Sequence, residues 1–262
     1  MNRKSAIFNI IFILALAAFA ALELANIDFF GDQKLSGMFK PILTRGIGGI
    51  LAIMLMKRLG YGRLLSVSGK PFRRPFLLTL PCLLVCVNNF PFIGLFTGNA
   101  RVTSGAGFVA LFALECISVG LFEEAVFRGI IFPIFLEKAR GEREIFKAVL
   151  FSSAVFGGVH LFNVFAGAGI APTLLQVGYS FLMGGMWAVS LLHYGHIWPC
   201  AAMHAIYNFG GMLIPNHGEG LVWDAWTVVI TAVLGIAVGA YVLFYLFKKA
   251  AARIANEEQG II

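Results

Sequence analysis

The sequence contains few charged residues: Asp, Glu, Lys and Arg make up 13% of its 262 residues, whereas 59% are hydrophobic. Soluble domains carry about 25% charged residues, so this composition excludes an ordinary soluble protein. The apolar runs are each long enough for a membrane span of about 20 residues and predict an all-α polytopic membrane protein with about eight transmembrane helices. No remaining stretch could hold a soluble domain, so we expect residues 1–262 to form a single membrane domain.

Cysteine is also scarce. The four cysteines lie in apolar stretches without a C-x-x-C pair of the kind that binds metals: Cys82, Cys86, Cys116 and Cys200. We interpret them as buried packing residues. The sequence has no HExxH motif either, so the spacing of its histidines does not demand zinc. It shows no clear repeat in two halves, a feature of many transporters.

Acidic residues are outnumbered, and the formal net charge is +7. This charge does not indicate nucleic-acid binding, because the basic residues gather in a few loops, which is the positive-inside pattern of membrane proteins. We therefore expect an integral, multi-pass protein of the cell membrane with both termini in the cytoplasm. The expected cytoplasmic segments between spans are 57–74, 137–147 and 193–196. The expected spans are 5–25, 41–56, 75–97, 105–136, 148–165, 173–192, 197–214 and 226–247.

Three charged residues interrupt the apolar span 105–136: Glu123, Glu124 and Arg128. A charge near the middle of a bilayer costs about 3 kcal/mol or more, so such residues usually face the protein interior and pair. Glu124 and Arg128 are four residues apart on one helix face, which predicts an ion pair. Glu123 points about 100° away and would be free for chemistry. On this stretch alone, a helix that has reached the membrane surface explains the charges equally well.

Two later spans carry polar residues at helical spacing. Phe156 and His160 are four residues apart in one span, and His204 and Asn208 in another. The two glycines that follow Phe156 would let another backbone approach closely. A single histidine in a membrane helix is more often a packed, hydrogen-bonded residue than a catalyst. Polar groups on three separate helices, however, need partners away from water, so we expect them to meet in one polar cavity.

These residue types suit the hydrolysis of an acyl bond. Glu123 can act as general base on a water molecule, with His160 helping to orient and deprotonate it. His204 and Asn208 can donate hydrogen bonds to the oxyanion of the tetrahedral intermediate. A zinc mechanism is the alternative, because two histidines and one carboxylate suffice for a catalytic zinc with an open position; His160 and His204 would then be ligands. The cofactor is thus either one divalent metal or none.

The ordered set of motifs resembles the CPBP family, which includes CAAX prenyl endopeptidases and bacteriocin-processing or bacteriocin-immunity membrane proteins. The motifs are Glu123-Glu124-x-x-x-Arg128, Phe156-x-x-x-His160 and His204-x-x-x-Asn208, within a motif region at 106–214. The resemblance implies an eight-helix intramembrane endopeptidase whose active-site cavity opens towards the cytosol. It implies that Glu123 and His160 activate water, that His204 and Asn208 bind the oxyanion or a ligand, and that Glu124 and Arg128 support them.

The expected substrate is a membrane-associated peptide or protein, lipidated or not, in contact with membrane lipid. Two other functions remain open. Inward-facing Glu and His clusters also serve in transporters and proton pathways. An immunity protein that keeps the fold but only binds a partner would also carry these motifs. Among the other polar residues, we expect Glu115 to extend the cavity or to pair with a neighbouring helix. We expect three other histidines to be solvated: His193, His196 and His217.

Overall fold

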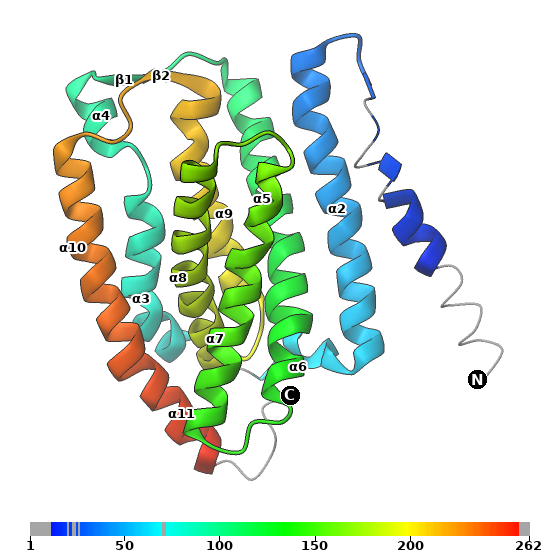
Figure 1. Ribbon diagram of the computed structural model, residues 1–262, viewed down its shortest axis with the longest axis vertical. Helices are drawn as coiled ribbons and strands as arrows, with labels where there is room; N and C mark the ends of the chain where they lie inside the picture. The colour runs from blue at the N-terminus through cyan, green and yellow to red at the C-terminus, as the bar shows by residue number, and fades with distance from the viewer. Residues whose placement is uncertain (1–11, 20, 23–24, 26, 70–71, 257–262) are drawn as a thin grey trace.

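The computed structural model describes residues 12–19, 21–22, 25, 27–69 and 72–256, and almost all of the regular structure in these residues is helical (Figure 1). The longer helices are α2 (Gln33–Leu59), α3 (Arg73–Asn88), α5 (Ala106–Val126), α7 (Glu142–Gly158), α8 (Ile170–Tyr194), α9 (Trp198–His217), α10 (Ala225–Tyr241) and α11 (Phe247–Asn256). The shorter elements are η1 (Tyr61–Leu65), α4 (Phe92–Thr97), η2 (Phe127–Ile131), α6 (Phe132–Leu136), η3 (Val159–Val164) and η4 (Val242–Leu246). The expected all-α fold is confirmed.

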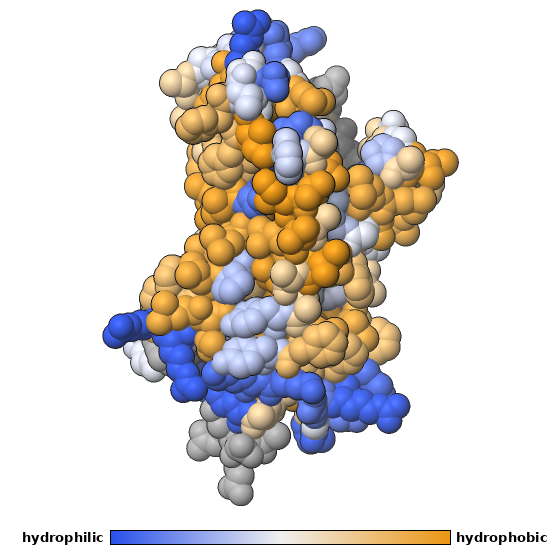
Figure 2. Space-filling model, turned by 90° about the vertical axis from the view of Figure 1, so that its left-hand side faces the viewer, coloured by the Kyte–Doolittle hydropathy of each residue, from blue (hydrophilic) through white to orange (hydrophobic). Residues whose placement is uncertain are grey.

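Five helical stretches of the described chain are long and apolar enough to cross a membrane: Gln33–Leu59, Ala106–Leu136, Glu142–Val164, Ile170–Tyr194 and Ala225–Ile254. An apolar band lies between two hydrophilic ends on the molecular surface, as a membrane protein requires (Figure 2). The protein is therefore polytopic, but the expected count of eight spans is not confirmed. Helix α3 has only 16 residues, and α9 contains the polar residues of the candidate site. About half of the first expected span, 5–25, lies outside the described residues, and residues 12–19 and 21–22 within it are helical.

Several expected boundaries are wrong. Residues 33–40 were expected in a loop but begin α2, because the Asp32 side chain accepts hydrogen bonds from the Lys34 and Leu35 backbone N–H groups and caps the helix. The expected span 75–97 is broken between α3 and α4 at Pro91, which cannot donate a backbone hydrogen bond. Helix α7 starts at Glu142 inside the expected charged loop, since acidic residues favour the first turn of a helix.

The central helix α5 packs against α2 on one side and α9 on the other, while α7 packs against α8. Glycines permit the closest of these approaches. A Cβ at Gly120 of α5 would lie 2.8 Å from the Ala201 carbonyl oxygen of α9. A Cβ at Gly157 of α7 would lie 2.8 Å from the Val177 carbonyl oxygen of α8, as the sequence predicted. The same expectation for Gly158 is wrong, because nothing lies within 4 Å of a Cβ there.

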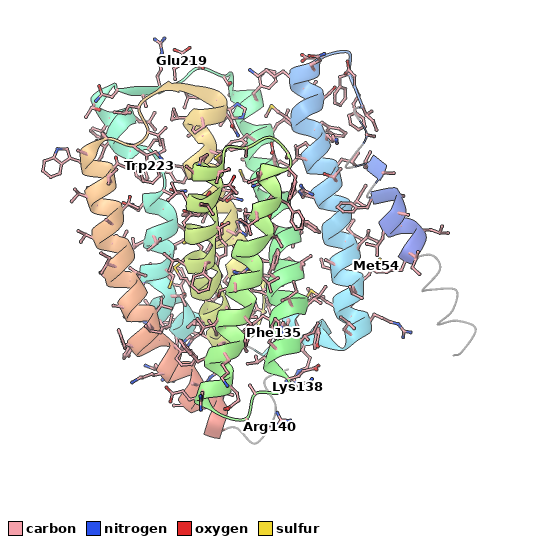
Figure 3. The ribbon with its side chains drawn as sticks, viewed as in Figure 1. Met54, Phe135, Lys138, Arg140, Glu219 and Trp223 are labelled. Atoms are coloured by element: carbon pink, nitrogen blue, oxygen red, sulfur yellow. The ribbon has the colours of Figure 1, made fainter. Side chains whose placement is uncertain are left out.

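The two ends of the helix bundle differ in structure and charge. At one end, the short strands β1 (Ala100–Val102) and β2 (Gly218–Gly220) form an antiparallel pair, and we call this the β-bridge end. The other end holds η1, the connection between α6 and α7, and α11; it carries most of the basic residues, and we call it the basic end. Figure 3 shows Glu219 at the β-bridge end and Lys138 and Arg140 at the basic end.

Candidate active site

The deepest part of the site is the ion pair between Glu124 and Arg128. Arg128 Nη1 lies 3.1 Å from Glu124 Oε1, and both side chains are fully buried. Arg128 Nη2 also donates to the Gly184 carbonyl oxygen of α8 at 3.0 Å. The pair expected from the i,i+4 spacing is therefore confirmed. Arg128 lies in η2, a π-helical turn that widens α5 directly after the two glutamates, and such turns are frequent at functional sites.

His204 of α9 joins the two adjacent glutamates of α5. Its Nδ1 lies 3.0 Å from Glu124 Oε1, and its Nε2 lies 3.7 Å from Glu123 Oε2. Because a carboxylate oxygen only accepts, the short contact assigns the ring proton to Nδ1. The Glu124 carboxylate thereby fixes the ring so that Nε2 faces Glu123. The Glu123 side chain keeps 23% exposure, in contrast to the fully buried Glu124.

Aromatic rings enclose this polar network. The Trp187 ring stacks on His204 at a centroid distance of 4.4 Å, and Phe156 meets His204 edge-on at 5.8 Å. The Arg128 guanidinium lies 4.4 Å from the centroid of Phe156 and 5.3 Å from that of Trp187, which suits cation–π contacts. Phe156 is thus a packing residue of the site as well as a residue of the Phe156-x-x-x-His160 motif. The Phe156 and Trp187 rings hold His204 in place.

His160 lies at the end of the α7 stretch, in η3. Its Nδ1 lies 2.9 Å from the Phe156 carbonyl oxygen, and because a carbonyl only accepts, Nδ1 is the donor. This leaves Nε2 of the neutral ring as an acceptor. In the described chain, the ion pairs of Glu123 do not include His160, so the two side chains do not bond directly.

A cavity of about 320 Å³ brings the four residues expected to be catalytic together: Glu123, His160, His204 and Asn208. The four lie on α5, η3 and α9, and α8 closes the remaining wall. Glu124 and Arg128 do not line the cavity, which fits the supporting part expected of them. Asn163, three residues after His160 on the same helix face, also lines the cavity, whereas sequence reasoning missed several other polar lining residues: Gln176, Tyr179, Tyr207 and Asn216. The spacing along α9 could have suggested Asn216, because it follows Asn208 by eight residues, which is about two helical turns.

Glu115 also lines the cavity, so the first of its two expected roles is confirmed. The expectation of solvated histidines is wrong for all three. His193 is 9% exposed, His196 is 6% exposed and His217 is 4% exposed. His193 Nε2 contacts the Leu246 carbonyl oxygen at 2.9 Å, and His217 Nδ1 contacts the Ser104 hydroxyl at 3.2 Å. His193 and His217 lie in the last turns of α8 and α9 and His196 in the short turn between these helices, where neighbouring segments cover all three side chains.

A second hollow lies beside the cavity. It is an apolar groove of about 670 Å³ between α10 and the pair α7–α8. Tyr179, Met183 and Tyr207 line both spaces, and the Tyr179 and Tyr207 ring centroids lie 6.1 Å apart. Only a few side chains therefore separate the polar cavity from the apolar groove.

The residues present do not fit the zinc site considered from the sequence. A catalytic zinc takes three protein ligands. In the part of the chain that the structure describes, no three His, Cys, Asp or Glu side chains are close enough to hold a metal ion. The mechanism proposed below accordingly uses no metal.

Comparison with known proteins gives one match. Residues 105–210 match the family model described as type II CAAX prenyl endopeptidase, Rce1-like. No curated protein and no solved structure matches the chain. The matched region contains all three motifs and every residue of the Glu124–Arg128–His204 network. Over this region, which is less than half of the chain, the protein is similar to CAAX-protease-like intramembrane endopeptidases.

Proposed function

We propose that the protein is an intramembrane endopeptidase that hydrolyses a peptide bond with a water molecule activated by Glu123. The observation that carries this proposal is the contrast between the two adjacent glutamates. Glu124 is fully buried and bonded to Arg128 and His204, whereas Glu123 is partly exposed in the cavity. A carboxylate that is free of a guanidinium partner and open to water can accept a proton, which is the task of a general base.

In the proposed reaction, Glu123 takes a proton from water while the resulting hydroxide attacks the carbonyl carbon of the substrate. His160 Nε2, left as an acceptor by the hydrogen bond of Nδ1, orients this water. The oxyanion of the tetrahedral intermediate accepts hydrogen bonds from Asn208 and, when its ring carries a second proton, from His204 Nε2. Glu123 then passes its proton to the leaving nitrogen as the C–N bond breaks, giving a carboxylic acid and an amine.

Glu124 and Arg128 act in this proposal by positioning. Glu124 Oε1 lies 3.0 Å from His204 Nδ1, which sets the direction of Nε2, while Arg128 neutralises the buried carboxylate. A carboxylate that orients a catalytic imidazole has the same part in Ser-His-Asp hydrolases. The adjoining apolar groove supports a substrate held in or at the membrane, because its lining would contact the apolar part of such a molecule.

The test is the Glu123→Gln variant, purified in mild detergent and assayed on quenched fluorescent peptides that carry an aliphatic anchor. Loss of a general base lowers kcat by about 100-fold or more, and the amide keeps the size of the side chain. Glu219→Gln is the matched control, because Glu219 is an exposed residue of β2 whose carboxylate pairs with Arg101 and does not line the cavity. Unchanged cleavage by Glu123→Gln would contradict the proposal. Cleavage that a chelator abolishes would contradict the metal-free mechanism.

A further inference from the structure

The cavity opens towards one end of the bundle, as the exposure of its lining shows. On α9, His204, Asn208, Met212 and Asn216 follow one another at four-residue steps and all line the cavity. His204 is 3% exposed and Met212 is 47% exposed, while Asn208 is intermediate and Asn216 is exposed. Twelve residues of helix span about 18 Å, so exposure rises steadily over that distance towards the β-bridge end.

Helix α8 shows the same gradient, although it runs in the opposite direction. Trp187 is 1% exposed, Met183 is 6% exposed and Tyr179 is 39% exposed, and all three line the cavity. The start of α8 lies at the β-bridge end, so exposure again increases towards that end (Figure 1). Two helices of opposite direction thus place the mouth of the cavity at the same end.

The opposite side of the site is closed. Glu124, directly after Glu123, and Arg128, just over one helical turn beyond Glu123, are fully buried, and Phe132 follows at 0% exposure. Leu192 on α8 is 2% exposed, so apolar core fills the space between the site and the basic end. A peptide cannot reach Glu123 from the basic end without displacing this core.

Polar side chains surround the mouth. Asn163 Nδ2 donates to Gln176 Oε1 at 2.8 Å, and this pair joins η3 to α8 beside the opening. Asn216 and Glu115 also line the cavity on the β-bridge side of Glu123. Polar groups at membrane depth are tolerated where they line a space that contains water, so this opening suits water and a polar peptide segment rather than lipid.

The charges of the two ends decide which side of the membrane the mouth faces. The described lysines and arginines of the basic end are Lys57, Arg58, Arg63, Arg73, Arg74, Lys138, Arg140, Arg143, Lys147, Lys248, Lys249 and Arg253, whereas those near the β-bridge end are Lys34, Lys40 and Arg101. Basic loops remain in the cytoplasm. We infer that the cavity opens on the non-cytoplasmic face, so that its substrates are peptide segments lying at that face.

This inference departs from the cytosolic opening that the family resemblance implied. The inference that the cavity opens on the non-cytoplasmic face does not depend on catalysis. The inference that the substrates are peptide segments at that face rests on the proposed function. The two parts need separate measurements, because a protein without protease activity would still have a mouth on one side of the membrane.

Cysteine labelling in a bacterial inner membrane tests the direction. The full-length chain carries Asn216→Cys or Gln176→Cys at the mouth, or Lys138→Cys at the basic end as the matched control. A sulfonated, membrane-impermeant maleimide is added to spheroplasts or to inverted vesicles. The four native cysteines are buried, and the unsubstituted chain gives their background labelling. We expect at least a tenfold excess of mouth labelling in spheroplasts over inverted vesicles, and the reverse for Lys138→Cys.

Labelling of Asn216→Cys and Gln176→Cys only in inverted vesicles would overturn the inference. So would labelling of the mouth and Lys138→Cys from the same side, because the mouth would then not lie opposite the basic end. For the substrate, a single-span reporter carries its cleavable segment on either side of the membrane. Cleavage is expected only on the non-cytoplasmic side and only with intact Glu123. Cleavage only on the cytoplasmic side would refute the substrate statement, and no cleavage on either side would refute the proposed function.

Discussion

Glu123 and Glu124 are neighbours in the sequence, yet they lie in opposite environments. Glu124 is fully buried against Arg128 and His204, beneath the aromatic rings of Phe156 and Trp187. Glu123 is partly exposed in a cavity of about 320 Å³. The 100° rotation between successive helix residues is sufficient to place one carboxylate in the core and the other in the open space.

This difference separates stability from catalysis in the site. A buried charge loses its hydration and depends on its partners, so changes at Glu124 and Arg128 should act on folding. A partly hydrated carboxylate depends less on its neighbours, so changes at Glu123 should act on activity. Arg128→Leu and Glu123→Gln test that separation directly, and the other two variants give reference effects on stability away from the two glutamates; the order runs from the largest expected effect on stability to the smallest.

Arg128→Leu is expected to reduce the free energy of unfolding most, by about 3–5 kcal/mol, because it leaves the Glu124 carboxylate buried without its cation. The measurement is denaturant unfolding of the purified protein in detergent. The double variant Glu124→Gln with Arg128→Leu should be more stable than the single variant, since no unpaired buried charge remains. A single variant within about 1 kcal/mol of the wild type would show that the pair is not required for folding.

Gly157→Ala is expected to destabilise by about 1–3 kcal/mol, because the new methyl group would lie 2.8 Å from the Val177 carbonyl oxygen and force α7 away from α8. Gly158→Ala is the matched control one position later, where nothing lies within 4 Å of the added atom. That control should be neutral or slightly stabilising, since alanine favours the helix. Equal thermal shifts for the two variants would show that the α7–α8 approach is looser than described.

Tyr61→Phe removes a hydrogen bond at the basic end, where the Tyr61 hydroxyl donates to Glu137 Oε1 at 2.8 Å. Burial, together with Glu137, raises the pKa of Tyr61 from its usual 10.0 to about 12. A raised pKa means that the folded state holds the proton more tightly, so the stabilisation is complete below pH 10 and is lost between pH 10 and pH 12.

The expected loss for Tyr61→Phe at neutral pH is about 0.5–1.5 kcal/mol. The difference in melting temperature between wild type and variant should shrink as the pH rises through 10 to 12. A difference that is constant over this range would mean that the hydrogen bond does not contribute.

Glu123→Gln is expected to have the smallest effect on stability, within about 0.5 kcal/mol, although it removes most of the activity. The reason is that Glu123 is partly exposed and contacts His204 Nε2 only at 3.7 Å. Thermal unfolding alongside the peptide assay measures both properties on one sample. If Glu123→Gln lost both its activity and several kcal/mol of unfolding free energy, the proposed contrast between Glu123 and Glu124 would be wrong.

Much of the site could be predicted from spacing alone. The i,i+4 rule predicted the Glu124–Arg128 pair and left Glu123 free, because helix geometry is local. The same rule could not predict which atoms of Glu124 and His204 meet, since these residues are 80 positions apart and their approach depends on how α5 packs on α9. Gln176 was missed because it carries no charge and belongs to no motif.

The helix boundaries show the same limit. A hydropathy pattern predicts where a chain is apolar, but it does not include hydrogen bonding. Asp32 caps the start of α2 with its side chain, and Pro91, which lacks a backbone N–H, precedes the start of α4. The buried histidines His193, His196 and His217 were wrongly expected in solvent, because the sequence does not show which distant segments cover a helix end or a tight turn.

The sequence by itself determined the membrane class, the all-α fold, the basic loops and the three motifs within the matched residues 105–210, because composition and helical periodicity are properties of neighbouring residues. Only the tertiary structure decided that His204 contacts both glutamates, that aromatic rings close the site on one side, and that the cavity opens at the β-bridge end. These features depend on contacts between helices distant in sequence, where the packing of side chains, rather than local propensity, sets distance and exposure.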